Sequence, residues 1–230
     1  MLTDGRRVVS FSGAGLSAES GVGTFRDAQD GLWAKYDPAR LASPEGFAAD
    51  PELVINWYAA RRRIIGDAQP NPAHIALADR GDIVHVTQNV DDLLHRAGAE
   101  QVIALHGSIG LDHCHGGCGH IQPVDMTDPP NLRDCPACGA PLRPAVVWFG
   151  EAMPPEAWDI AERVCRGCDA LLVIGTSAVV YPAAGLIGVA KSAGAEIIVV
   201  NTEPSEASPL ADIELLGQAG RIVPQLLAHK

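Results

Sequence analysis

Five apolar runs recur along the chain, and each is followed by small or polar residues. The runs are rich in Val, Ile and Leu and do not alternate apolar with polar positions, a pattern typical of strands buried on both faces of a parallel sheet. The predicted strands cover residues 7–11, 83–87, 101–105, 170–174 and 196–200. Each strand should therefore have helices packed on both sides.

Helix signals lie between these runs. Asn71 is a predicted N-cap, with Pro72 at the first helical position. Gly98 should end a helix that begins near Asp91, and Pro182 should begin another. Strands and helices that alternate in this way predict a doubly wound, parallel, Rossmann-like α/β sheet.

The polar residues that follow the strands predict a binding site. In a doubly wound sheet, ligands bind outside the carboxyl ends of the strands, which lie on one edge. The residues expected there are 13–15, 88–91, His106, 175–177 and Asn201.

Two segments do not fit the predicted sheet. Residues 21–71 contain loops and helices, and residues 107–144 are rich in Gly, Pro and Cys. We expect a Rossmann-like nucleotide-binding domain formed by 1–20, 72–106 and 145–230. The other two segments would be a helical/loop insertion and a small metal-binding insertion.

The metal prediction rests on two close pairs of cysteines, with 16 residues between the pairs. Their spacing resembles that of a zinc ribbon, although the first pair has three intervening residues where two are usual. Four thiolates complete a tetrahedral shell, so the zinc would be structural. The predicted ligands are Cys114, Cys118, Cys135 and Cys138.

Alternatives remain for the cysteines. The four could be unligated thiols, or His113, His115 or His120 could replace one thiolate. Cys165 and Cys168 form a further close pair, between a predicted helix and the next strand. We interpret this pair as packing rather than as a metal or redox site.

The first predicted strand is followed by a G-x-G-x-x-A motif, residues 13–18. Its glycines would let the backbone approach a pyrophosphate, and the N-terminus of the following helix would attract the charge. A tight turn is the alternative. A dehydrogenase would have a second strand ending in Asp or Glu about 20 residues on. Residues 20–27 instead resemble a loop, so we expect a bound nucleotide that is not a redox carrier.

Charge and hydropathy exclude other classes of protein. The net charge of −11 argues against nucleic acid as the main partner, because phosphate binding requires clustered Lys and Arg. The uncharged stretch 170–190 is interrupted by polar residues and a proline, so no membrane span is expected. The first strand begins too close to Met1 to leave room for a signal peptide. These features predict a cytoplasmic protein, which we expect to be a monomer.

Taken in order, the motifs resemble the sirtuin family. The resemblance extends over nearly the whole chain and implies an NAD-dependent protein-lysine deacylase, with free lysine, nicotinamide and O-acyl-ADP-ribose as products. Ser12, where many sirtuins have threonine, and the spacing of the first cysteine pair are minor departures. The matching segments are 13–22, 24–26, 87–91, 105–107, the cysteine quartet, 146–151, 175–177, 201–203 and 217–220.

The resemblance also implies roles for single residues. His106 would be the general base on a ribose hydroxyl, since an unperturbed histidine titrates near pH 6.5. Asn89 and Asp91 would complete the catalytic set. Small polar residues at strand ends are also common caps, which is the alternative for many of these positions. The residues expected to bind NAD are Gly13, Ala14, Gly15, Glu19, Thr24, Phe25, Arg26, Gln88, Asn89, Val90, Asp91, Gly175, Thr176, Ser177, Asn201, Thr202, Glu203 and Ala219.

Acylated-lysine proteins or peptides are the implied partners. The peptide would bind as an added strand. The residues expected to contact it are Val147, Phe149, Gly150 and Val180, for which plain core packing is the alternative.

The acyl group itself would be selected by Tyr58 and Arg61. They are three residues apart on a predicted helix and so share a face. An arginine with a phenol beside it can bind a carboxylate. Sirtuins of class III have this Tyr-x-x-Arg pair and remove succinyl or malonyl groups, and small Ala28 also resembles that class. The alternative is a solvated basic face at 61–63 with Tyr58 as packing.

Three other functions are alternatives. The chain could be a plain deacetylase, or a mono-ADP-ribosyltransferase that uses the same NAD site. It could also be a non-catalytic module whose zinc ribbon contacts nucleic acid. The ribbon has Arg133 and Arg143 but no lysine, against four aspartates, which disfavours that last function.

Overall fold

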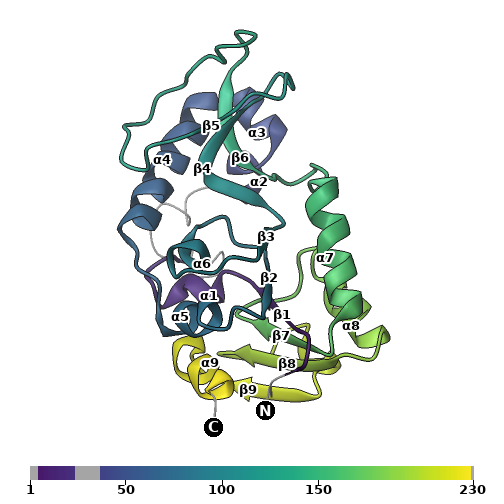
Figure 1. Ribbon diagram of the computed structural model, residues 1–230. Helices are drawn as coiled ribbons and strands as arrows, with labels where there is room; N and C mark the ends of the chain where they lie inside the picture. The colour runs from purple at the N-terminus through teal and green to yellow at the C-terminus, as the bar shows by residue number, and fades with distance from the viewer. Residues whose placement is uncertain (1–4, 24–36, 229–230) are drawn as a thin grey trace.

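The computed structural model describes residues 5–23 and 37–228 and contains two sheets (Figure 1). The larger sheet has six parallel strands in the order β3-β2-β1-β7-β8-β9. The five predicted strands are confirmed as members of it. β9, which was not predicted, is an edge strand with three exposed residues of four, and its side chains do not form an apolar run. The strands are β1 (Val8–Ser12), β2 (Val84–Thr87), β3 (Val102–Ala104), β7 (Ala170–Ile174), β8 (Glu196–Asn201) and β9 (Ile213–Leu216).

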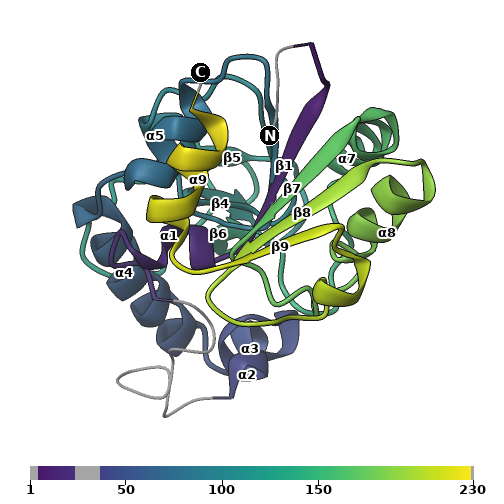
Figure 2. The ribbon, with the colours of Figure 1, turned by 90° about the horizontal axis from the view of Figure 1, so that it is seen from below.

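Helices cover both faces of this sheet (Figure 2). α5 (Pro72–Ala78) and α9 (Ala219–Leu227) lie on one face, and α7 (Pro155–Gly167) and α8 (Gly185–Ser192) on the other. Successive β7 residues enter opposite cores: Leu172 packs in the α5/α9 cluster, and Leu171 packs in the α7/α8 cluster. Burial on both faces explains why the strand sequences are apolar throughout.

Several helices are shorter than the sequence predicts. α1 (Gly15–Ala18) and α6 (Leu93–Arg96) are single turns, and α8 begins at Gly185 instead of Pro182. In contrast, Asn71 caps α5 as expected, and its side chain accepts hydrogen bonds from the amides of Ala73 and His74. Among the described residues, no helix is both long and apolar enough to cross a membrane.

The smaller sheet is antiparallel and lies at the opposite end of the structure (Figure 1). It contains β4 (Gly107–Cys114), β5 (Ile121–Pro123) and β6 (Leu142–Val146), in the order β5-β4-β6. These strands were not predicted, because their Gly, Pro and polar residues do not resemble strand sequences. The division into domains at residues 20, 71, 106 and 144 stays a prediction. The remaining elements are α2 (Pro38–Leu41), α3 (Pro44–Ala49), α4 (Pro51–Asp67) and η3 (Ser208–Leu210).

A separate core joins α3 and α4 to the smaller sheet. Phe47, Trp57, Ile65, Ile109 and Trp148 belong to this buried cluster. Helix α4 is therefore held between the smaller sheet and the carboxyl edge of the larger one, where Leu93 and Val90 also join the cluster.

A buried ion pair fixes α4 against β4. The Arg62 guanidinium donates to Asp112 Oδ1 at 2.7 Å and to the carbonyl oxygen of Ile109 at 2.8 Å. Arg133 donates to the other Asp112 oxygen at 3.1 Å. Both charged groups of the pair are nearly inaccessible, with side chains 8% and 5% exposed. Good geometry and these further hydrogen bonds offset the cost of desolvating the charges.

Replacing Arg62 with Met should therefore lower the free energy of unfolding by about 3 kcal/mol, because it leaves the buried Asp112 carboxylate with only its partly exposed Arg133 partner. Urea unfolding followed by circular dichroism measures this loss. Arg63→Met is the matched control, since Arg63 is exposed on the same helix. Equal stability of the two variants would contradict the structural role of the pair.

Candidate active site

The candidate site lies where the strand order of the larger sheet reverses, between β1 and β7. Dinucleotides bind at this switch point in sheets of this order. The backbones that leave the two strands touch each other: the Gly15 amide donates to the Gly175 carbonyl oxygen at 2.8 Å. Gly175 has a φ of +58°, and a Cβ there would lie 2.4 Å from the Gly15 carbonyl carbon. Only glycine permits this approach.

The helix within the glycine motif, α1, is one turn long, so its dipole is small. That its N-terminus attracts phosphate stays a prediction. The polar atoms at this edge come mainly from side chains at the ends of β2, β3, β7 and β8.

A hydrogen-bonded cluster connects Ser17 to the end of β2. The Ser17 hydroxyl donates to Asp91 Oδ2 at 2.9 Å and accepts from Asn89 Nδ2 at 3.2 Å. His74 Nε2 lies 3.4 Å from the Ser17 hydroxyl oxygen, and the backbone amide of Asn71 donates to His74 Nδ1 at 3.3 Å. These partners place the imidazole proton on Nε2. Burial lowers the pKa of His74 to about 4, so the ring is neutral.

Ser17 and His74 were not among the predicted site residues. Ser17 lies inside the glycine motif, where the sequence draws attention to the glycines, and His74 is at the third position of a capped helix. Asp91, the acceptor for Ser17, is half-buried. Burial raises the pKa of its carboxyl, while hydrogen bonds from the Leu93 amide and Ser17 oppose that rise.

His106 lies in the turn between β3 and β4, and one of its ring nitrogens already has a hydrogen-bond partner. Its Nδ1 lies 2.8 Å from the carbonyl oxygen of Gln88. Because a carbonyl oxygen only accepts, Nδ1 carries the proton and Nε2 keeps a free lone pair. Burial lowers the pKa of His106, and the hydrogen bond to Gln88 partly opposes this shift. At neutral pH the ring is therefore a neutral base.

Side chains from three strand ends form a chain of hydrogen bonds. Gln88 Nε2 donates to Thr176 Oγ1 at 3.0 Å, and Asn201 Nδ2 donates to the Thr176 carbonyl oxygen at 2.9 Å. The structure thus brings together predicted residues from β2, β7 and β8, which are far apart in the sequence.

The other predicted NAD-binding residues occupy varied positions. Glu19 Oε1 accepts from the Gly220 amide at 2.8 Å, which ties the glycine motif to the start of α9 beside Ala219. The Val90 carbonyl accepts from the Ile109 amide at 2.9 Å.

Other predicted NAD-binding residues differ in exposure. Ala14 and Ser177 are half-buried, and Thr202 and Glu203 are exposed after β8. Thr24, Phe25, Arg26 and Ala28 lie outside the described residues.

The segment after β6 begins beside His106. The Val147 amide donates to the carbonyl oxygen of His106 at 2.9 Å. Burial then alternates: Trp148 is 2% exposed and Phe149 is 49% exposed. Gly150 is exposed, and Val180, after β7, is 38% exposed.

Tyr58 and Arg61 lie on α4, and the structure buries the phenol. Tyr58 is 3% exposed, and burial raises its pKa to about 12, so the hydroxyl keeps its proton at neutral pH. The Arg61 guanidinium lies 5.1 Å from the centre of the Trp57 ring. Burial lowers the pKa of Arg61, and attraction to Tyr58 and Asp91 opposes this shift. Arg61 therefore lies within electrostatic reach of Asp91.

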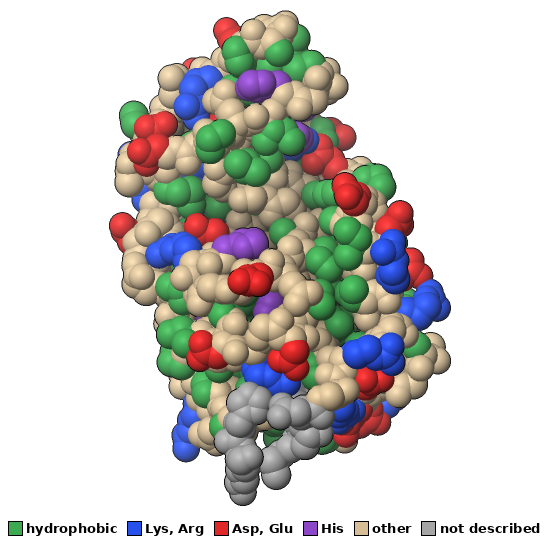
Figure 3. All heavy atoms as spheres, in the orientation of Figure 1, with side chains coloured by type: hydrophobic (Ala, Val, Ile, Leu, Met, Phe, Trp, Pro, Cys, Tyr) green, Lys and Arg blue, Asp and Glu red, His purple; other side chains and the backbone are tan. Residues whose placement is uncertain are grey.

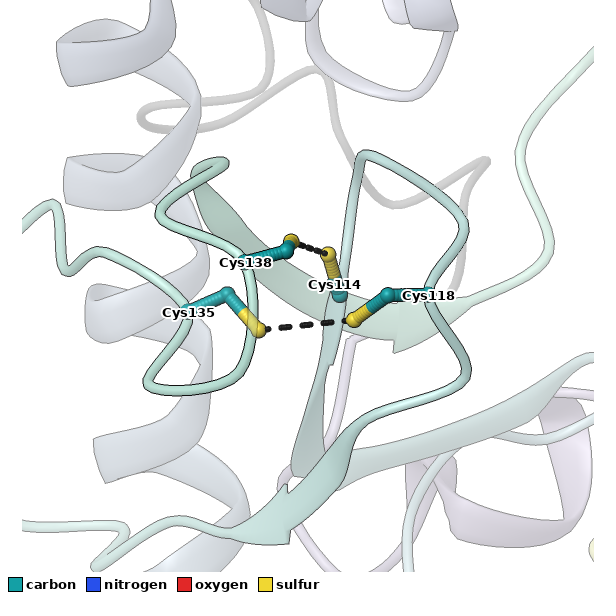
Figure 4. A group of neighbouring side chains, drawn as sticks. All are labelled: Cys114, Cys118, Cys135 and Cys138. Atoms are coloured by element: carbon teal, nitrogen blue, oxygen red, sulfur yellow. Dashed lines mark hydrogen bonds between the residues drawn. The ribbon is translucent and has the colours of Figure 1, made fainter.

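The four predicted zinc ligands converge at the far end of β4 (Figure 4). All four sulfur atoms lie within 4.8 Å of one another, with Cys114 and Cys138 at 3.3 Å and Cys118 and Cys135 at 3.6 Å. A tetrahedral site with zinc–sulfur bonds of about 2.3 Å has sulfur–sulfur distances of roughly 3.8 Å. The quartet therefore fits a closed, structural zinc site.

The remaining cysteine pair supports the packing interpretation. Cys165 and Cys168 are buried in the α7/α8 core, and the Cys168 thiol donates to the Cys165 carbonyl oxygen at 3.1 Å. Burial raises their pKa values to about 12 and about 11. Such thiols stay protonated and are poor ligands and nucleophiles.

We expect the purified protein to contain equimolar zinc, measured by inductively coupled plasma mass spectrometry. Cys135→Ser should lose the metal and melt at a lower temperature, because structural zinc contributes directly to folding. Cys168→Ser, the matched control, should keep its zinc. Full zinc content in the Cys135 variant would contradict the assignment.

Comparison with known proteins agrees with this geometry. Residues 13–182 match the Sir2 family. "NAD-dependent protein deacylase 2" of Pyrobaculum aerophilum is 48% identical over 99% of this chain and 92% of its own. "NAD-dependent protein deacylase" of Ralstonia nicotianae is 49% identical over 96% of this chain and 91% of its own.

Solved structures match as well. A Sir2 homologue in complex with NAD superposes with a TM-score of 0.90 at 46% identity, covering 96% of this chain and 87% of that one. A Sir2 protein with a p53 peptide and NAD+ has a TM-score of 0.83 at 27% identity, covering 96% of this chain and 92% of that one. A Sir2 protein bound to a myristoylated histone peptide has a TM-score of 0.76 at 34% identity, covering 96% of this chain and 89% of that one. The chain belongs to the Sir2 family, whose sirtuin motifs the sequence contains.

Proposed function

We propose that this chain is an NAD-dependent protein-lysine deacylase that removes succinyl and malonyl groups and also acetyl groups. Family membership and the names of its relatives support the general activity. One observation supports the preference for acidic acyl groups: Tyr58, which is buried, and Arg61, which is half-buried, lie one turn apart on α4. A carboxylate there would offset the desolvation of the guanidinium and accept hydrogen bonds from both groups.

NAD, when bound, would supply the ribose carbon that the acyl-lysine amide oxygen attacks, with nicotinamide as the leaving group, and the ribose hydroxyl to which the acyl group is finally transferred. The protein would position this co-substrate with the Gly13–Gly15 backbone and with Gln88, Asn89 and Asp91. His106 Nε2, which has no proton, would accept one from a ribose hydroxyl. The carbonyl of Gln88 holds the ring in the required tautomer.

The acylated substrate would bind beside His106. Val147, Phe149 and Gly150 would contact the peptide on one side and Val180 on the other, as in strand addition. The exposed side chains of Phe149 and Val180 are consistent with this role, since a peptide would cover them. The peptide complexes of the related Sir2 proteins support a peptide substrate.

We also infer that nucleic acid is not a main partner and that the protein acts as a cytoplasmic monomer. The net charge of −11 supports the first inference. On the face displayed in Figure 3, acidic and basic side chains are interspersed instead of forming a continuous basic surface.

The pH dependence of kcat/KM tests the role of His106. Because burial lowers the pKa of this base, activity should be lost only as the pH falls below the ordinary value of 6.5. His106→Ala should abolish turnover of acetyl- and succinyl-lysine peptides alike. An acidic limb with its midpoint above pH 7, or activity retained in the alanine variant, would rule this role out.

Arg61→Met tests acyl recognition. The KM for a succinyl-lysine peptide should rise by at least about ten-fold, because a charge-assisted hydrogen bond is lost, while an acetyl-lysine peptide of the same sequence is unaffected. Arg63→Met, exposed on the same helix, should change neither value. A wild-type enzyme that ignores succinyl-lysine would make this protein a plain deacetylase.

A further inference from the structure

The Tyr58 hydroxyl is oriented by a residue from the peptide-binding segment. Trp148 Nε1 donates to the Tyr58 oxygen at 2.8 Å, and the two side chains are 2% and 3% exposed. An indole N–H can only donate, so the Tyr58 oxygen must act as the acceptor. The phenolic proton is therefore directed away from Trp148.

That proton has no acceptor among the described residues, for which the bond from Trp148 is the only hydrogen bond of the phenol. The pKa of about 12 means that the proton is retained. A buried donor without a partner is unfavourable by about 1 to 3 kcal/mol. Tyr58 thus has a free donor close to Arg61, the second group expected to contact the acyl carboxylate.

Trp148 is itself held rigidly. Glu151 Oε2 accepts from the Trp148 backbone amide at 2.9 Å, and the other oxygen of Glu151 pairs with Arg143. The Arg143 guanidinium lies 3.9 Å from the centre of a Trp148 ring, and the Phe47 ring packs at 5.5 Å. With the indole fixed in this way, its N–H keeps one direction.

We propose that Trp148 is a specificity-determining positioning residue: its indole N–H orients the Tyr58 hydroxyl so that the phenolic proton is presented to the carboxylate of a succinyl or malonyl group. This inference rests on the proposed function and deepens it. It also connects the two halves of substrate recognition, because Trp148 lies between Val147 and Phe149, whereas Tyr58 is on α4.

The decisive variant is Trp148→Phe, which removes the N–H but keeps an aromatic ring against Arg143. The KM for the succinyl-lysine peptide should rise about three- to ten-fold with kcat unchanged, because ground-state and transition-state binding weaken together. The acetyl-lysine peptide should be unaffected. Trp158→Phe on α7, the matched control, should change neither peptide.

A double-mutant cycle separates positioning from a merely structural role. In a Tyr58→Phe background, Trp148→Phe should cause no further loss of succinyl activity. Equal losses with both peptides, or losses that add to those of Tyr58→Phe, would overturn the proposal. If the phenylalanine variant does not fold, benzothienylalanine at position 148 replaces the N–H by sulfur in a ring of the same shape and makes the same test.

The wild type distinguishes this proposal from the proposed function on which it rests. If the unmodified enzyme ignores succinyl-lysine, the acyl preference itself fails. If it prefers succinyl-lysine and Trp148→Phe retains that preference in full, only the role of Trp148 fails.

Discussion

The close contact between the Gly15 and Gly175 backbones is the constraint on which the rest of the site depends. The contact joins the backbones that follow β1 and β7, at the point where the strand order reverses. A side chain at position 175 would prevent this contact. The ends of β2, β3 and β8 are then placed by their pairing with these two strands. Residues from Ser17 to Asn201 consequently meet on one edge of the sheet.

Directional hydrogen bonds set the chemical state of the groups gathered there. A backbone carbonyl fixes the proton of His106 on Nδ1, and Ser17 and the Asn71 amide fix that of His74 on Nε2. The indole of Trp148 acts in the same way on Tyr58. In each case burial makes the position of the proton more strictly determined, because a side chain removed from water has few alternative hydrogen-bond partners. The site is organised by fixed donors and acceptors more than by net charge.

Much of the fold could be predicted from the sequence because its signals are local. The apolar runs predict the five central strands, Asn71–Pro72 predicts the start of α5, and the cysteine spacing predicts the quartet that the structure brings together. The strands of the smaller sheet and exposed β9 have no such pattern. Ser17, His74 and Trp148 were missed because their importance comes from partners distant in sequence, such as Asp91 for Ser17 and Tyr58 for Trp148.

The central claim is that this Sir2-family site transfers an acidic acyl group from lysine to ADP-ribose. Mass spectrometry of the products formed from NAD and a succinyl-lysine peptide tests it most directly. The proposed function predicts deacylated peptide, nicotinamide and O-succinyl-ADP-ribose in equal amounts. Free succinate without consumption of NAD, or ADP-ribose attached to protein with the succinyl group still on lysine, would contradict it.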